Sequence, residues 1–187
     1  MVVLITGGND NGKSEYAEDL VLKLSRGGKA SGYTRLYLAT MSARDDESLE
    51  RIQKHVLRRK DMEYITIEKS CDLGTLDLES YVQGNGNSND HIILLIEDIP
   101  NLLAGEMFKG KDFNPFVSDK ITNDIKKLVS VCEHTVIVTN EVFSDGITYD
   151  EYTTAYLREF GAINKGLSMI SDKVVELVCG IPVDIKG

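Results

Sequence analysis

A glycine-rich segment directly after a short apolar run constrains the fold of this chain most strongly. The segment fits the pattern GxxxxGK[ST], and the β-branched run Val2–Thr6 precedes it. From Lys13 to about Leu24, apolar residues recur at helical spacing. A buried strand, a glycine-rich turn and an amphipathic helix in this order predict a phosphate-binding loop, or P-loop. Its predicted nucleotide-binding residues are Gly7, Gly8, Asn9, Asp10, Asn11, Gly12, Lys13 and Ser14.

The chemistry of such a loop follows from its backbone and from two side chains. Glycines let several N–H groups converge on one phosphate, and the helix N-terminus adds partial positive charge. We expect Lys13 to reach the β and γ phosphates and the Ser14 hydroxyl to bind Mg²⁺. A second metal ligand is expected after a neighbouring strand, where Glu97 and Asp98 follow the apolar run Ile92–Ile96. Either carboxylate could instead cap a helix.

Composition excludes several other classes of protein. The net charge of −9 makes the chain a poor general binder of nucleic acid or anionic membrane. No apolar run approaches the length of a membrane span, and the N-terminus lacks the features of a signal peptide. Cys71, Cys132 and Cys179 are widely spaced without a CxxC pair, which favours the reducing cytoplasm over a disulfide framework or zinc site.

Strand and helix patterns alternate along the chain. We therefore predict an α/β fold, a P-loop (RecA-like) mostly parallel sheet with helices on both faces and a C-terminal β-hairpin. The whole chain, 1–187, is predicted to form a single P-loop nucleotide-binding domain, with a polar surface loop at 83–90. Strands are expected at 2–6, 35–40, 64–67, 92–96, 135–139, 174–178 and 183–185, and helices at 13–24, 45–59, 117–132 and 149–170.

One of the three histidines lies in a setting that fits catalysis. His91 and His134 stand at the starts of predicted strands, where surface residence is the simpler interpretation. Helical spacing places His55 on one face with Arg51 and Arg58. Arginine neighbours disfavour the cationic imidazole and so favour a neutral, nucleophilic one, and they could hold phosphates in line for attack. The alternative is an ordinary solvated helix.

Several segments together resemble one enzyme family, the bifunctional cobinamide kinase / cobinamide-phosphate guanylyltransferases of cobalamin assembly. The resemblance covers nearly the whole chain, and the pairing of a P-loop with a histidine helix is far more specific than the P-loop alone. The matching segments are Tyr37–Thr40, Asp45–Glu47, Arg51–His55 with Arg59, Tyr64–Glu68, Val138–Val142 with Gly146 and Ile147, Arg158 to Leu167, and Gly180 with Ile181.

The resemblance implies two reactions on one scaffold. First, a nucleoside triphosphate, ATP or GTP, phosphorylates the aminopropanol hydroxyl of (adenosyl)cobinamide. Second, the family's histidine, which falls on His55, attacks the α phosphate of GTP and then passes GMP to cobinamide phosphate. Mg²⁺ bound by Ser14 and Glu97, together with Lys13, would neutralise the leaving pyrophosphate. The family is also described as a homotrimer. Further implied nucleotide contacts are Ala39, Thr40, Met41, Val56, Leu57, Arg58, Arg59, Glu68 and Glu97.

This chain departs from the family pattern at a few positions. The family loop has Arg-Ser where this chain has Asp10 and Asn11, a proline where it has Lys60, and a glycine where it has Phe143. An anion at Asp10 should weaken phosphate binding unless its side chain points outward or helps to hold a metal. Two alternatives therefore stay open, a chain that retains only guanylyl transfer and a non-catalytic nucleotide-binding protein.

Overall fold

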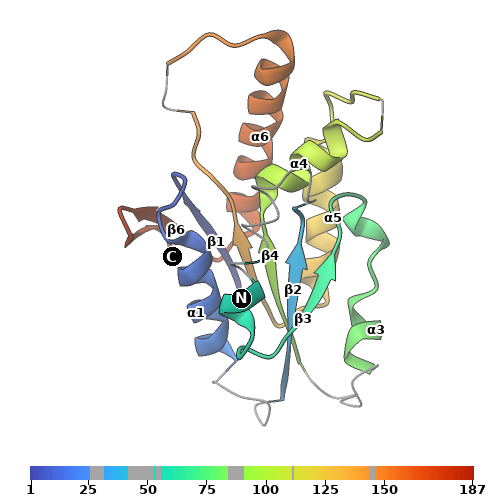
Figure 1. Ribbon diagram of the computed structural model, residues 1–187, viewed down its shortest axis with the longest axis vertical. Coiled ribbons are helices and arrows are strands. Elements are labelled where there is room, and N and C mark those ends of the chain that lie inside the picture. Colours follow the sequence, from blue (N-terminus) through green and yellow to red (C-terminus); the bar gives the residue numbers. More distant parts are fainter. Residues whose placement is uncertain (26–31, 42–52, 54–55, 84–90, 111, 144–145) are drawn as a thin grey trace.

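The computed structural model describes residues 1–25, 32–41, 53, 56–83, 91–110, 112–143 and 146–187. Within these residues one sheet has the strand order β3-β2-β4-β5-β1-β6-β7 (Figure 1). All neighbouring strands pair in parallel except β6 and β7, which form an antiparallel hairpin. The strands are β1 (Val2–Gly7), β2 (Tyr33–Ala39), β3 (Tyr64–Glu68), β4 (His91–Glu97), β5 (His134–Val138), β6 (Lys173–Val178) and β7 (Ile181–Lys186). The predicted mostly parallel sheet and C-terminal hairpin are confirmed.

Helices cover both faces of the sheet (Figure 1). Helix α1 packs on one face, and α4, α5 and α6 pack on the other. The helical elements are α1 (Lys13–Leu24), the 3₁₀ helix η2 (Leu73–Thr75), α3 (Leu78–Gln83), α4 (Ile99–Met107), α5 (Ser118–Ser130) and α6 (Glu151–Ile170). Residues 56–59 are also helical.

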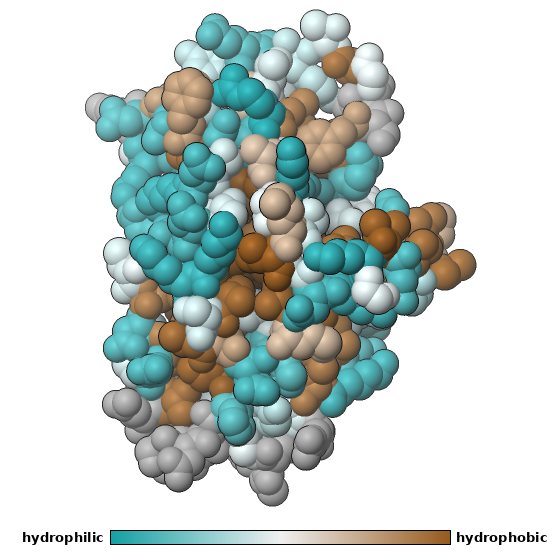
Figure 2. All heavy atoms as spheres, turned by 180° about the vertical axis from the view of Figure 1, so that it is seen from behind, coloured by the Kyte–Doolittle hydropathy of each residue, from teal (hydrophilic) through white to brown (hydrophobic). Residues whose placement is uncertain are grey.

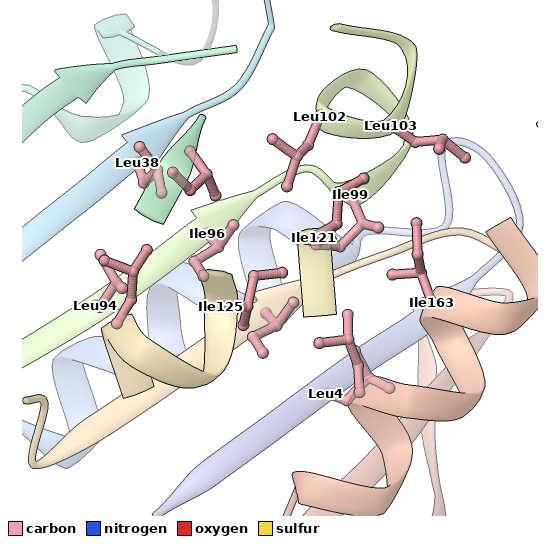
Figure 3. Packing of buried hydrophobic residues seen from close by; sticks show 14 of the residues in the cluster. Leu4, Leu38, Leu94, Ile96, Ile99, Leu102, Leu103, Ile121, Ile125 and Ile163 are labelled. Carbon is pink, nitrogen blue, oxygen red and sulfur yellow. The ribbon is translucent and has the colours of Figure 1, made fainter. Parts of the chain in front are cut away.

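Alternate residues of the central strands supply the two cores, which is why their sequences are apolar throughout. Leu4 and Leu94 point toward α5 and α6, where they meet Ile125 and Ile163 (Figure 3). The odd-numbered neighbours in β1, such as Ile5, belong instead to the core beneath α1.

Some expected elements differ from the observed ones. The sequence did not predict η2, α3 and α4, whereas the predicted strands and the helices predicted at 13–24, 117–132 and 149–170 agree with the structure within a few residues. Of the helix predicted at 45–59, only 53 and 56–59 lie among the described residues, so His55 lies outside them. Most of the loop predicted at 83–90 also lies outside, and its first residue, Gln83, ends α3.

The C-terminal hairpin has an apolar surface. Apolar side chains gather on the hairpin that projects from one edge of the molecule (Figure 2). Ile181, Val183 and Ile185 of β7 are all exposed. Among the described helices, none is long and apolar enough to cross a membrane.

Candidate functional site

The P-loop connects β1 to α1 and lies at the carboxyl edge of the parallel strands. Gly7 has φ +138°, and a Cβ there would lie 2.5 Å from the Leu177 carbonyl oxygen of β6. Only glycine therefore fits where the chain leaves β1. Gly12, with φ +79°, precedes the first residue of α1.

Polar side chains fix the loop to its surroundings. Asn11 Nδ2 donates to the Leu177 carbonyl at 3.2 Å, and Asn140 Nδ2 donates to Asn9 Oδ1 at 3.2 Å. The Lys13 side chain is buried and folds back, so that Nζ donates to the Gly8 carbonyl at 2.5 Å. The lysine side chain thus bridges the two ends of the loop.

Asp10, the acidic departure from the family loop, has φ +54° and is exposed. Water can therefore solvate its carboxylate. The unfavourable effect of this charge on a phosphate is reduced accordingly.

The two carboxylates after β4 have different roles. Glu97 Oε1 accepts a hydrogen bond from Ser14 Oγ, and Glu97 Oε2 accepts one from the Tyr37 hydroxyl at 2.8 Å. Asp98 instead caps α4, because its Oδ1 accepts from the Asn101 backbone N–H at 3.0 Å. Of the two candidates from the sequence, Glu97 is thus the one that faces the P-loop.

Ser14 and Glu97 fit a magnesium ion by the chemistry of their donors. Both are hard oxygen donors, and the Ser14 hydroxyl at the start of α1 contacts the Glu97 carboxylate at the end of β4 directly. Mg²⁺ is usually bound by one or two carboxylates together with substrate phosphates and water. The described residues contain no cluster of three or more acidic, histidine or cysteine ligands, which such a site does not require.

Thr40 sets the position of the chain just beyond β2. It is completely buried, its backbone N–H donates to the Glu97 carbonyl at 2.9 Å, and its Oγ1 accepts from the Asp98 N–H at 2.8 Å. The side chain therefore fixes the end of β4 from within the protein. Its neighbour Ala39 pairs in register with Glu97 on one side and Glu68 on the other. Glu68 is exposed, and Met41 is half-buried.

The helical segment 56–59 packs on the same face of the sheet as α1. Val56 and Leu57 are exposed, whereas Arg59 is buried and its Cζ lies 3.3 Å from the centroid of the Tyr37 ring. Arg58 makes a two-pronged contact with Glu18 of α1, at 2.6 Å and 2.8 Å. These contacts fix the segment that leads to His55 beside α1 and β2. In this structure Arg58, which the sequence offered as a phosphate ligand, is engaged by Glu18.

Burial shapes the electrostatics of this region. Burial raises the pKa of Glu18, although the guanidinium of Arg58 partly offsets that effect. Burial, with the negative charge of Glu97, also raises the pKa of the Tyr37 hydroxyl well above its usual range. The Tyr37 hydroxyl therefore keeps the proton that it donates to Glu97.

Sequence reasoning gave no role to Glu18 or to the Tyr37 side chain, although both had a signal. Glu18 stands four residues after Ser14, which is one helical turn along α1. Tyr37 lies two residues before the end of β2, so the alternation of strand residues places it on the same face as Ala39 and its register partner Glu97.

Comparisons of the sequence with known proteins identify the family. A family model described as cobinamide kinase / cobinamide phosphate guanyltransferase matches residues 3–185. The bifunctional adenosylcobalamin biosynthesis protein CobU of Escherichia coli (strain K12) is 30% identical over 198 aligned residues, with all of both chains covered. That of Salmonella typhimurium (strain LT2) is 30% identical over 191, again with full coverage of both chains.

Solved structures support the fold alone. One of them, described as an ATPase domain, superposes with a TM-score of 0.55 at 16% identity, covering 94% of this chain and 68% of that one. The Pyrococcus horikoshii protein PH0250 superposes with a TM-score of 0.55 at 12% identity, covering 100% of this chain and 86% of that one.

Proposed function

The chain belongs to the cobinamide kinase / cobinamide phosphate guanyltransferase family, and we propose that it carries out both reactions of that family's name. The observation that carries the proposal is the contact of Ser14 in the P-loop with Glu97, beside the segment that leads to His55.

In the first reaction the hydroxyl oxygen of (adenosyl)cobinamide attacks the γ phosphorus of ATP or GTP. The bond to the β–γ bridging oxygen breaks, and a nucleoside diphosphate leaves.

The second reaction proceeds through a covalent histidine. A ring nitrogen of His55 attacks the α phosphorus of GTP, and pyrophosphate leaves with the electrons of the broken P–O bond. A phosphate oxygen of cobinamide phosphate then attacks the guanylyl-histidine, which gives GDP-cobinamide and restores the histidine. The covalent intermediate divides one difficult transfer into two easier steps.

The chain's own residues bind and orient the nucleotide in this scheme. Lys13 exchanges its bond to the Gly8 carbonyl for the β and γ phosphates, and backbone N–H groups of the loop hold phosphate oxygens. Arg59 is oriented by the Tyr37 ring and presents a charged, planar donor near the histidine segment. When bound by Ser14 and Glu97, Mg²⁺ supplies charge neutralisation at the phosphates.

We extend the proposal to the state of the whole protein. Residues 1–187 act as one transferase unit that associates with further copies of itself, a trimer by resemblance. The exposed apolar strand β7 supports association. The three cysteines are free, which suits the reducing cytoplasm.

A labelling experiment tests the covalent mechanism. The protein is incubated with Mg²⁺ and GTP labelled at the α phosphate, denatured, and assayed for label that stays on the chain. We expect an adduct that is labile in acid and stable in alkali, that is absent with γ-labelled GTP, and that is lost in His55→Ala. His91→Ala is the matched control, because His91 is exposed and begins β4, at the end of the parallel strands that is opposite to the P-loop.

The possible results separate the proposal from its alternatives. Absence of the adduct while GTP still binds would overturn guanylyl transfer. Formation of the adduct without phosphorylation of cobinamide would show that only guanylyl transfer is retained, an alternative favoured by the presence of His55, Arg59 and Glu68. Binding of GTP with neither reaction would leave a non-catalytic nucleotide-binding protein, for which the acidic Asp10 is the favouring feature.

A further inference from the structure

One side chain contacts both functional regions of the site. The Tyr37 hydroxyl donates to Glu97 Oε2 at 2.8 Å, and the opposite carboxylate oxygen, Oε1, accepts from Ser14. The face of the same ring lies 3.3 Å from the Cζ of Arg59. A hydrogen bond and a stacked cation thus meet on a single buried residue.

The two contacts use different parts of Tyr37. The hydroxyl restrains the rotation of the Glu97 carboxylate, which leaves Oε1 directed at the P-loop serine. The ring face restrains Arg59, whose guanidinium is held by attraction to the negative π surface. Removing the hydroxyl would therefore release Glu97 alone, and removing the ring would release both partners.

Neighbouring contacts show that this arrangement is held firmly. Tyr37 is buried beneath α1, and the Tyr64 ring packs edge-on against it at 5.9 Å between centroids. Glu97 is fixed by the backbone bond from Thr40, and Arg59 by the attachment of Arg58 to α1. The Tyr37 side chain contacts both of these anchored residues, Glu97 through its hydroxyl and Arg59 through its ring.

We infer that Tyr37 is a positioning residue that holds Glu97 through its hydroxyl and Arg59 through its ring, and so positions both the metal-binding side of the P-loop and the helical segment 56–59. The inference deepens the proposed function and rests on it. Hydrogen-bond partners of metal-ligating carboxylates commonly change metal affinity by about 10- to 100-fold when removed. Tyr37 would act on both reactions through Glu97 and Arg59, without touching the transferred group itself.

The test measures binding of a non-hydrolysable GTP analogue, with and without Mg²⁺, by titration calorimetry. In Tyr37→Phe we expect the Mg²⁺ concentration that half-saturates the enhancement of binding to rise about 10-fold. Affinity in EDTA should stay that of the wild type, because Arg59 keeps its ring. In Tyr37→Leu the affinity in EDTA should also fall, because Arg59 loses that ring.

Tyr64→Phe is the matched control for a lost hydroxyl. Within the described part of the chain the Tyr64 hydroxyl is buried without a hydrogen-bond partner, and its ring belongs to the same aromatic pair. We expect its metal dependence to equal that of the wild type. A change in stability alone would alter both tyrosine variants without shifting the Mg²⁺ titration of either.

Arg59→Gln provides a second variant should Y37F fail to fold. It removes the stacked cation but leaves the hydrogen bond between Tyr37 and Glu97, so it should weaken binding in EDTA and leave the Mg²⁺ half-saturation unchanged. The inference would be overturned if the Mg²⁺ half-saturation of Y37F equalled that of the wild type, or if that of R59Q shifted. Either outcome would leave the proposed function standing. Failure of the wild type to bind the analogue would overturn both.

Discussion

At the scale of single residues, the P-loop depends on backbone geometry as much as on its charged side chains. Gly7 approaches β6 so closely that any side chain would meet the Leu177 carbonyl, whereas a Cβ at Gly12 would meet nothing within 4 Å. Both glycines have positive φ, but only Gly7 combines that conformation with a backbone obstacle.

We predict that Gly7→Ala is markedly more damaging than Gly12→Ala. G7A should lower the free energy of unfolding by about 3 kcal/mol, since a strand or the loop has to move. G12A should cost only about 1 kcal/mol, the strain of a left-handed residue. Urea denaturation measures both, and equal losses would contradict the role given to the close approach at Leu177. We expect nucleotide affinity to fall further in G7A, because the displaced loop carries the phosphate-binding N–H groups.

At the scale of elements, the sequence predicted what depends on periodicity and missed what depends on tertiary contact. The strands and the helices α1, α5 and α6 have clear apolar patterns. Helix α4 is short, and its Pro100 and Gly105 are residues that usually interrupt a helix. Asp98 and Pro100 are nevertheless typical of the start of a helix, as an N-cap and a first-turn proline. Gly105 is required because a Cβ there would lie 2.1 Å from the Ser70 carbonyl oxygen, a contact that no local pattern reveals.

In the candidate site too, some residues could be predicted from local sequence and others depend on tertiary contact. Lys13, Ser14 and Glu97 could be found from a motif and from the ends of strands, because local sequence determines both. The stack of Arg59 on Tyr37 joins residues that are 22 positions apart. Whether Arg58 or Arg59 faces the ring depends on how the 56–59 segment docks against α1, and its sequence does not specify that orientation.

An ion-pair network joins η2, α4 and α5 on the other face of the sheet. Lys120 pairs with Asp72, Glu106 and Asp124, and Lys109 also pairs with Asp72. Hydrogen bonds from Lys109 and Lys120 lower the pKa of Asp72 to about 2 from its ordinary value of 3.8. Because the folded pKa is the lower one, this carboxylate stabilises the fold above about pH 4, and the effect is lost as the pH falls toward 2.

Asp72→Asn should therefore make stability less dependent on pH in acid. We expect a loss of no more than about 1 kcal/mol at pH 7, since the side chain is partly exposed and screened. Between pH 5 and about pH 2 the difference from the wild type should shrink. Thermal unfolding across this range at low salt measures the effect, with the exposed Asp61→Asn as control. A constant difference at every pH would exclude a charge-dependent contribution.

At the scale of the whole molecule, the hairpin combines a polar attachment with an apolar outer face. Lys186 Nζ donates to the Ser171 carbonyl at 2.5 Å, and Lys173 pairs with Asp184 at 2.9 Å, so polar contacts tie the C-terminal half of β7 to the body of the protein. Val183 lies opposite Glu176, and Ile181 opposite Val178, so the exposed apolar residues at these positions share one face. In the described sheet, β7 is also an edge strand whose outer side pairs with no other strand. Such a strand invites association unless it is covered.

If the proposed oligomer forms through this face, Val183→Lys should dissociate it. Val183 is 41% exposed, so the substitution should change the stability of the monomer by less than about 0.5 kcal/mol. A lysine placed in an apolar contact would have to be desolvated, which opposes association. Light scattering coupled to size exclusion should show a mass near that of the 20.8 kDa monomer for V183K and a multiple of it for the wild type.

The matched control is Val131→Lys, at a residue of similar exposure, 45%, that lies outside the hairpin at the end of α5. Dissociation by V183K alone would place the subunit contact on β7. An unchanged mass in V183K would show that the subunits contact each other through another surface and that the apolar face has no role in assembly.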